Sequence, residues 1–211
     1  MSLSAAGSRR LIHRRDIQLC GYVREDGQVE VEARMCDVKT YSMPNHDRRL
    51  IAAGEPLHDM WVRVALIPDT MEITACEASM DATPYGLCPQ IAPSMGRLVG
   101  LKIGKGFLRA AAQRVGGVEG CTHLRELLQP IATVAYQTRY SLQVHAHAVE
   151  GRTQRDGVDP GAGLLNSCYS YAETSPVVAR LRQEEEQGRA KYNDVTRADT
   201  EADGPGLMPK R

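Results

Sequence analysis

Residues able to bind a metal or to act as nucleophiles gather in three short segments of the chain. The segment GVEGCTHLREL, residues 117–127, places Cys121 two positions before His123, at the start of an apolar helical pattern. Free backbone amides in the first turn of a helix favour the thiolate form of a nearby cysteine, and a thiolate can bind a metal or act as a nucleophile. An ordinary helix start with a buried thiol would show the same pattern.

Two other segments carry the remaining candidate ligands. The sequence EPLHDMW places His58 and Asp59 together at the start of a predicted strand, and PYGLCP places Cys88 in a turn restricted by proline and glycine. Cysteine, histidine and aspartate are typical zinc ligands, and catalytic zinc sites combine three protein ligands with one open position. We therefore predict a site for zinc or iron that draws its ligands from His58, Asp59, Cys88, Cys121 and His123.

Several other side chains have weaker claims to a site. His145 and His147 alternate along a predicted strand and could share a metal, but a solvated strand face would look the same. Asp37 falls on the apolar face of its strand and Lys39 follows two residues later, which indicates either a buried ion pair or a fraying strand end. Among the four other cysteines, Cys20 and Cys76 are expected core thiols and Cys168 is a minor candidate for the site.

The composition is that of a folded chain without a nucleic-acid or membrane signature. Hydrophobic residues make up 42% of the 211 residues, and 26 basic residues balance 26 acidic ones. A nucleic-acid-binding protein normally carries a basic excess, and a membrane helix needs about 20 predominantly apolar residues. The first residues lack the apolar core of a secretory signal, so we expect a cytoplasmic location with reduced cysteines.

Alternating apolar and polar residues predict two antiparallel hairpins in the first part of the chain. The first covers residues 17–42 and contains Asp26-Gly27, a strong signal for a two-residue turn. The second covers residues 58–79. Between them lies a polar segment that predicts a loop.

Helical periodicity replaces the alternation after the second hairpin. It predicts helices over residues 93–115, where three glycines weaken the pattern, and over 122–136, with Thr122 as the N-cap. Residues 141–150 alternate again and predict a strand, and residues 164–192 predict a further helical stretch. Hairpins followed by packed helices are typical of an α+β fold.

We expect one α+β domain over residues 8–175, in which an antiparallel hairpin sheet is packed by helices. The predicted metal site would occupy its core, at about residues 55–138. Residues 176–211 are polar and are expected to form a helical and mobile tail.

Four motifs resemble a known bacterial family. The segments AGEPLHDMWVRVAL, PYGLCP, GLKIGKGF and GGVEGCTHLRELL resemble domain-of-unknown-function family 2889 over roughly residues 8–175, and GCTHL is the most specific of them. The family carries no assigned activity, so this resemblance bears on boundaries more than on function.

The order of elements is also distantly similar to iron–sulfur scaffold proteins of the IscU/SufU type. That resemblance implies an IscU/SufU-like core and matches Asp59, Cys88 and Cys121 to the scaffold's aspartate, turn cysteine and helix-start cysteine. The first scaffold cysteine has no counterpart, since Leu57 precedes His58. Fewer thiolates and more nitrogen or oxygen ligands shift the preference toward zinc or mononuclear iron.

These patterns predict a small metalloenzyme, a hydrolase or lyase acting on a small organic substrate. Asp59 or His123, whichever does not bind the metal, would serve as general base or orient the ligands. The alternatives are a non-enzymatic iron–sulfur or metal carrier, an enzyme that uses Cys121 as a nucleophile without metal, and a structural domain. Pairing of exposed strand edges would give a homo-oligomer.

Overall fold

The computed structural model describes residues 3–149 and 165–186. The chain divides between Tyr140 and Ser141 into two compact units. The first unit holds the sheet and the candidate site. The domain boundary that we predict after residue 175 stays a prediction.

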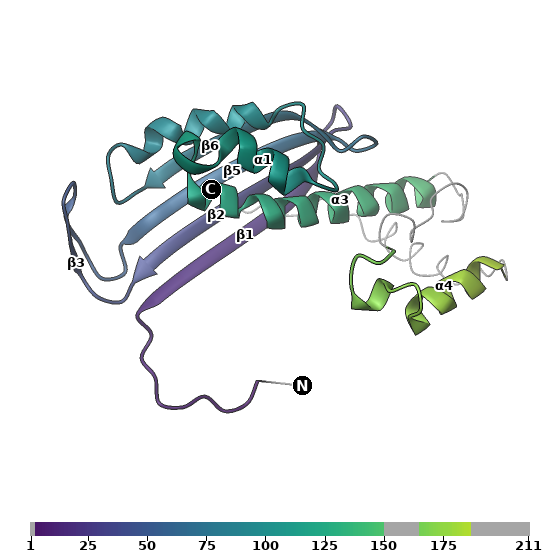
Figure 1. The fold of residues 1–211 in the computed structure, drawn as a ribbon, viewed down its shortest axis with the longest axis horizontal. Coiled ribbons are helices and arrows are strands. Elements are labelled where there is room, and N and C mark those ends of the chain that lie inside the picture. Colours follow the sequence, from purple (N-terminus) through teal and green to yellow (C-terminus); the bar gives the residue numbers. More distant parts are fainter. Residues whose placement is uncertain (1–2, 150–164, 187–211) are drawn as a thin grey trace. The chain divides into compact units, whose positions relative to one another are not determined.

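A four-stranded antiparallel sheet in the order β1-β2-β5-β6 forms the body of the first unit (Figure 1). Its strands are β1 (His13–Val23), β2 (Val29–Lys39), β5 (Pro56–Ile67) and β6 (Glu72–Ala82). Both predicted hairpins are therefore confirmed, and so is the α+β class, because the helices follow the sheet in the chain.

The turn of the first hairpin is longer than the two-residue turn that we predicted. Arg24 N–H donates to the carbonyl of Gln28 at 2.9 Å, so residues 25–27 form a three-residue loop. Gly27 adopts a φ of 80°, a left-handed conformation that glycine reaches without steric cost. This loop sets a register in which Arg15 lies opposite Asp37.

One face of the sheet forms the hydrophobic core. The inward-facing residues of β2 and β5 are at most 1% exposed: Val29, Val31, Ala33, Met35, Met60, Val62, Val64 and Leu66. Helices cover this face in Figure 1. They are the 3₁₀ helix η1 (Cys88–Leu98), α1 (Phe107–Val115), η2 (Gly117–Glu119), α2 (Thr122–Glu126) and α3 (Leu128–Val149).

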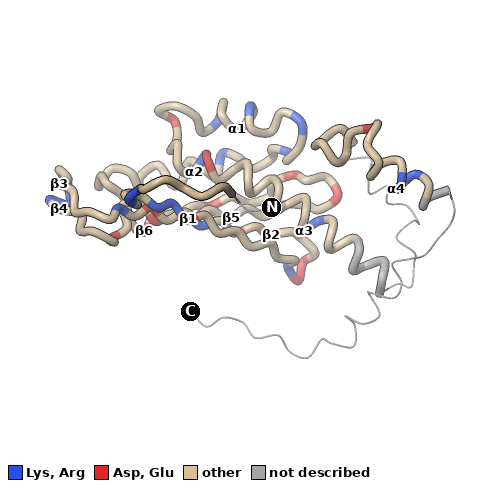
Figure 2. The backbone as a smooth tube through the Cα atoms, turned by 90° about the horizontal axis from the view of Figure 1, so that it is seen from below, with Lys and Arg blue, Asp and Glu red and all other residues tan. Residues whose placement is uncertain are grey.

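The opposite face of the sheet carries a network of charged side chains. Arg63 donates to Glu32 at 2.6 Å and to Glu77 at 2.7 Å across three neighbouring strands. The guanidinium of Arg34 lies 5.1 Å from the centre of the Trp61 ring. Basic and acidic positions are interspersed along the described chain (Figure 2), in keeping with the balanced composition.

The loop between β2 and β5 contains a second, two-stranded sheet that the sequence did not predict. It pairs β3 (Met43–Asn45) with β4 (Arg49–Ile51). The turn between them is fixed by the Asn45 side chain, whose oxygen accepts from the amides of Asp47 and Arg48 at 3.1 and 2.8 Å. Asp47 in turn accepts from the Gly86 amide at 2.7 Å, which ties this hairpin to the loop after β6.

The helices differ from the predicted ones at three places. The predicted helix over 93–115 is divided into η1 and α1, and Gly100 and Gly106 between them have φ values of 83° and 84°. The N-cap of α2 is Cys121, with extended backbone, in place of Thr122. Leu127 separates α2 from α3.

The strand that we predicted over residues 141–150 is wrong, because α3 remains helical up to Val149. Its alternating segment is short and contains one leucine, one glutamine and two alanines, which favour helix. Periodicity alone cannot separate a short strand from the end of a long helix. Within the described parts of the chain, no helix combines the length and apolar character needed to cross a membrane.

The second unit contains the end of α3 and two short helices, η3 (Tyr169–Tyr171) and α4 (Pro176–Glu186). The helical stretch that we predicted over 164–192 is therefore shorter and interrupted in its described part. The rest of the predicted tail lies outside the described residues.

Candidate functional site

A polar cluster interrupts the hydrophobic face at the end of the sheet where β2 ends and β5 begins. Asp37 and His58 are direct cross-strand partners there, and both face the helices. Asp37 is 1% exposed and His58 is 8% exposed. A buried carboxylate and imidazole are stable only when their polar atoms are paired, so their contacts define the site.

Arg15 holds the Asp37 carboxylate through two hydrogen bonds. Its Nε donates to Oδ1 at 2.8 Å and its Nη2 donates to Oδ2 at 2.7 Å. Nη1 of the same guanidinium donates to Glu126 at 2.5 Å, which connects β1 to α2. Burial alone would raise the pKa of Asp37, but the hydrogen bonds from Arg15 and His58 outweigh it and lower that pKa below its ordinary value. Asp37 is therefore ionised at neutral pH.

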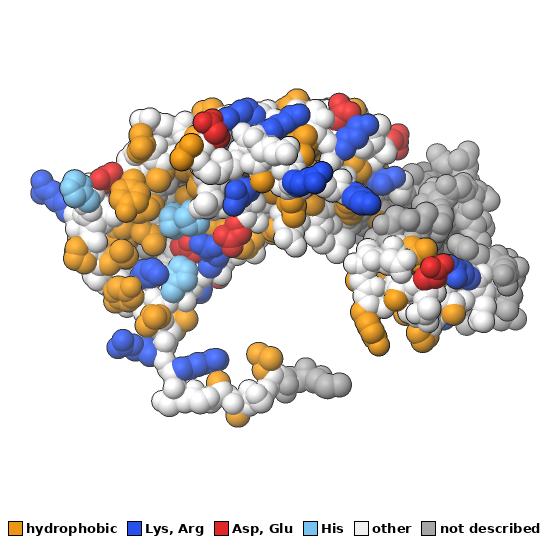
Figure 3. Space-filling model, viewed as in Figure 1, with side chains coloured by type: hydrophobic (Ala, Val, Ile, Leu, Met, Phe, Trp, Pro, Cys, Tyr) orange, Lys and Arg blue, Asp and Glu red, His pale blue; other side chains and the backbone are white. Residues whose placement is uncertain are grey.

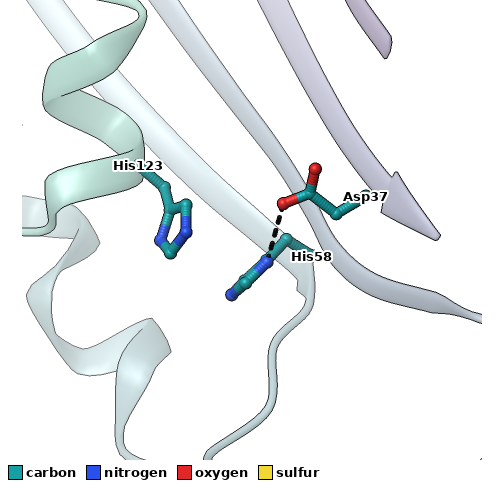
Figure 4. Close-up of side chains that lie close together, drawn as sticks. All are labelled: Asp37, His58 and His123. Carbon is teal, nitrogen blue, oxygen red and sulfur yellow. Dashed lines mark hydrogen bonds and ion pairs between the residues drawn. The ribbon is translucent and has the colours of Figure 1, made fainter. Parts of the chain in front are cut away.

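His58 donates its Nδ1 proton to Asp37, at a distance of 2.9 Å (Figure 4). An ionised carboxylate only accepts hydrogen bonds, which fixes the proton on Nδ1 and leaves the lone pair on Nε2. Burial lowers the pKa of His58, the neighbouring His123 lowers it further, and both outweigh the opposite effect of Asp37. The imidazole is thus neutral at pH 7, as a metal ligand or a general base must be.

His123 reaches the same place from the start of α2. Its ring centre lies 4.0 Å from that of His58, with the ring planes tilted by 37°. Cys121, the N-cap of α2, places its Sγ 3.9 Å from Nδ1 of His123. The GCTHL segment therefore adds an imidazole and a thiol to the two strand residues.

Gly120 allows this segment to pass close to the end of α1. A Cβ atom at position 120 would lie 1.9 Å from the carbonyl oxygen of Val115, a distance no real side chain adopts. The backbone of Gly120 is extended, with a φ of −161°, so close approach is the reason for glycine here. The chain then enters α2 with Cys121 and His123 directed at the sheet end.

Three of these residues meet the geometric requirement for a shared ion. Asp37, His58 and His123 each offer one ligand atom, and these atoms lie within 4.8 Å of one another. Figure 3 shows histidine side chains at the surface of this end of the first unit, beside acidic and basic groups and next to hydrophobic side chains. Asp37 and His58 are buried, and His123 is partly exposed.

The structure brings together some of the predicted site residues and separates others. His58 and His123 are in contact, and Cys121 adjoins His123. Asp59 points to the opposite face of the sheet, where Arg34 donates to its two oxygens at 2.8 and 2.6 Å. Cys88 lies at the start of η1, and it does not belong to the described group of ligand atoms.

Asp59 lies outside the cluster because side chains of adjacent strand residues point to opposite faces of the sheet. His58 and Asp59 are neighbours in β5, so only one of them can face the helices. The contact of Asp59 with Arg34 uses both of its oxygens, which fits a structural ion pair on the solvated face.

Arg15 and Glu126 are the site residues that sequence reasoning missed, and Asp37 was only a weaker candidate. The position of Asp37 on the apolar face of β2 was a usable signal, but its partner is Arg15 and not Lys39. Arg15 and Glu126 carried no signal of their own, because their roles depend on the register of β1 and on the placement of α2.

The weaker candidates lie elsewhere. Cys76 is buried in β6, where burial raises the pKa of its thiol to about 12, as expected for a core cysteine. Cys20 lies in β1, and Cys168 is exposed in the second unit. His145 and His147 belong to the helical part of α3, in place of the predicted strand.

Fold and site together define an α+β domain with a buried carboxylate–histidine cluster at one end of its sheet. Residues 13–137 match the model of the DUF2889 family, which is described as a protein of unknown function. The match spans more than half of the 211 residues, and the chain therefore belongs to this family, as its motifs indicated. Neither the curated proteins nor the solved structures gave a significant match, so the resemblance to IscU/SufU scaffolds stays a prediction.

Proposed function

We propose that the protein binds one zinc or ferrous ion at this cluster and acts as a small hydrolase or lyase on a small organic substrate. The observation that carries the proposal is the grouping of ligand atoms from Asp37, His58 and His123 within 4.8 Å. Two imidazoles beside an ionised carboxylate form a donor set that zinc and iron both accept.

In this proposal Asp37 orients the ligand His58 and does not bind the metal itself. Metal-binding histidines commonly donate their second ring nitrogen to a carboxylate, which fixes the tautomer and increases the basicity of the ligand. Asp37 has this relation to His58, and Arg15 already donates to both of its oxygens. His58 would thus bind through Nε2, with Asp37 behind it.

We propose Cys121 as the third ligand because its thiol adjoins His123, although its Sγ is not among the ligand atoms that lie within 4.8 Å of one another. In a tetrahedral zinc site, Zn–S of about 2.3 Å and Zn–N of about 2.0–2.1 Å place sulfur and nitrogen about 3.6 Å apart. The observed distance of 3.9 Å between Cys121 Sγ and His123 Nδ1 is close to this value. His58, Cys121 and His123 would leave a fourth position free for water or substrate, as catalytic sites require.

The proposed chemistry follows from that free position. A bound metal lowers the pKa of its water to near neutrality and polarises a substrate carbonyl. The residues of the chain hold this centre in place: Asp37 and Arg15 fix His58, and the start of α2 fixes Cys121 and His123. Because a thiolate ligand requires reduced cysteine, the proposal includes the predicted cytoplasmic location.

A thiol mechanism without metal is the second candidate, and the contact between Cys121 and His123 favours it. A cysteine with a neighbouring imidazole can act as a nucleophile after transfer of its proton. An iron–sulfur carrier has less support, because clusters are held mainly by several thiolates, and only Cys121 lies beside the described histidines.

Metal analysis of matched histidine variants tests the proposal. We expect about one zinc or iron per chain in tag-free protein purified anaerobically, and loss of this metal in His58→Ala. His46→Ala is the control, because the His46 side chain is 97% exposed in the β3–β4 turn. Hydrolysis of a model ester such as p-nitrophenyl acetate should then stop on chelation and return with added metal.

Equal metal content in His58→Ala and His46→Ala would contradict the proposed site. Absence of metal after anaerobic reconstitution would leave the thiol mechanism, which alkylation of Cys121 then tests. Two or more irons with charge-transfer absorption would support the carrier instead.

A further inference from the structure

Two basic residues, His13 and Lys39, lie next to the cluster on the same face of the sheet, nearer to the sheet end. His13 and Lys39 are direct cross-strand partners in β1 and β2, two residues along from the pair of Arg15 and Asp37. The register between these two strands has no bulge. Since side chains two residues apart share a face, His13 and Lys39 face the same side as Asp37.

The charges of this region leave Lys39 without a carboxylate. Both acidic groups at the cluster, Asp37 and Glu126, accept hydrogen bonds from Arg15. His13 lies 3.5 Å from Asp37 with its side chain 37% exposed. Among the ion pairs of the described residues, none includes Lys39, which is half-buried at the end of β2. A partly buried cation that lies beside a site and has no ion-pair partner among the described residues is suited to bind an anionic ligand.

We infer that Lys39, together with His13, binds a carboxylate of the substrate and makes the protein selective for small organic acids. The inference rests on the proposed metal site. Two strand residues span about 7 Å, so one acid molecule of a few carbon atoms could present one polar end to the metal and its carboxylate to Lys39. Arg15 is excluded from this role because its hydrogen bonds are committed to Asp37 and Glu126.

The inference predicts that a second carboxylate strengthens binding. The probes are acetate, with one carboxylate, and succinate, with two, titrated into the full-length cobalt-loaded protein and followed by its visible absorption. Succinate should bind at least about tenfold more tightly than acetate. This factor corresponds to the smallest contribution that a hydrogen bond to a charged group typically makes to binding.

Matched lysine variants assign the effect to one side chain. Lys39→Met should remove the preference for succinate, and Lys39→Arg should retain most of it, because the charge is kept. Lys102→Met is the control: Lys102 lies beside Glu72, which begins β6 at the opposite end of the sheet. Its preference for succinate should equal that of the unmodified protein.

Two failures are distinguishable in this experiment. If cobalt binds but Lys39→Met keeps the preference for succinate, or no preference exists, the role of Lys39 is overturned and the metal site stands. If none of the proteins, including the unmodified chain, binds cobalt, both the metal site and the inference built on it are overturned.

Discussion

Asp37 is a charged residue that the fold keeps almost completely out of water, at 1% exposure. In the proposed site it orients His58 without binding the metal. Asp37→Asn should therefore lower the affinity for zinc by about 10- to 100-fold and leave the stoichiometry at one ion, because groups behind the ligands typically contribute this much. Competition with a chromogenic chelator measures both quantities.

Asp59→Asn is the matched control for that variant. Asp59 is also a strand carboxylate held by an arginine, but it lies on the opposite face of the sheet. Its substitution should leave zinc affinity unchanged. Complete loss of the ion in a folded Asp37→Asn protein would instead make Asp37 a direct ligand, and equal effects of both variants would remove its special role.

The residues of the site were predictable from sequence only as far as local rules reach. Motif spacing indicated His58, Cys121 and His123, since each lies at the start of an element. The pairing of Asp37 with Arg15 depends on one residue of register. A two-residue turn at Asp26-Gly27 would have placed Asp16 opposite Asp37, and a one-residue slip turns every side chain to the other face.

At the scale of elements, the junction between α1 and α2 decides where Cys121 and His123 lie. Gly120→Ala would place a Cβ atom 1.9 Å from the oxygen and 2.6 Å from the carbon of the Val115 carbonyl. These are backbone atoms and cannot rotate away. We expect a loss of about 1–3 kcal/mol in the free energy of unfolding, together with weaker metal binding, as overpacking shifts the start of α2.

Urea denaturation and metal titration measure the two effects. Gly96→Ala is the control, because its added Cβ would meet only the Cys76 carbonyl oxygen at 3.8 Å, an ordinary contact. This variant should change stability by no more than about 0.5 kcal/mol. If the Gly120→Ala protein is as stable as the Gly96→Ala protein, the junction between α1 and α2 can adjust to a Cβ atom at position 120, and the prediction is wrong.

The elements themselves were predictable where their pattern was long. The sheet strands β1, β2, β5 and β6 each cover at least 11 residues, and the sequence indicated all four. Two of the errors fall on short patterns: the three-residue strands β3 and β4, and the alternating segment that α3 absorbs. Strand pairing determines the first of these structures, and continuation of the preceding helix determines the second. Neither can be recognised in a sequence window of a few residues.

At the scale of the whole molecule, two independent boundaries nearly coincide. The family match ends at residue 137, and the first compact unit ends at Tyr140. The described residues of the cluster all lie between His13 and Glu126. The first unit therefore contains everything that the proposed site uses.

A fragment of residues 1–149, which keeps α3 to its last helical residue, should fold and bind metal as the full chain does. The inner face of α3 belongs to the core of the first unit, since Leu128, Ile131 and Ala135 are fully buried. Thermal unfolding should show one cooperative transition, with the metal stoichiometry and affinity of the full-length protein. A fragment that ends at residue 127 should not fold, because it exposes the apolar surface that α3 covers. If the longer fragment folds but loses the metal, the second unit contributes to the site.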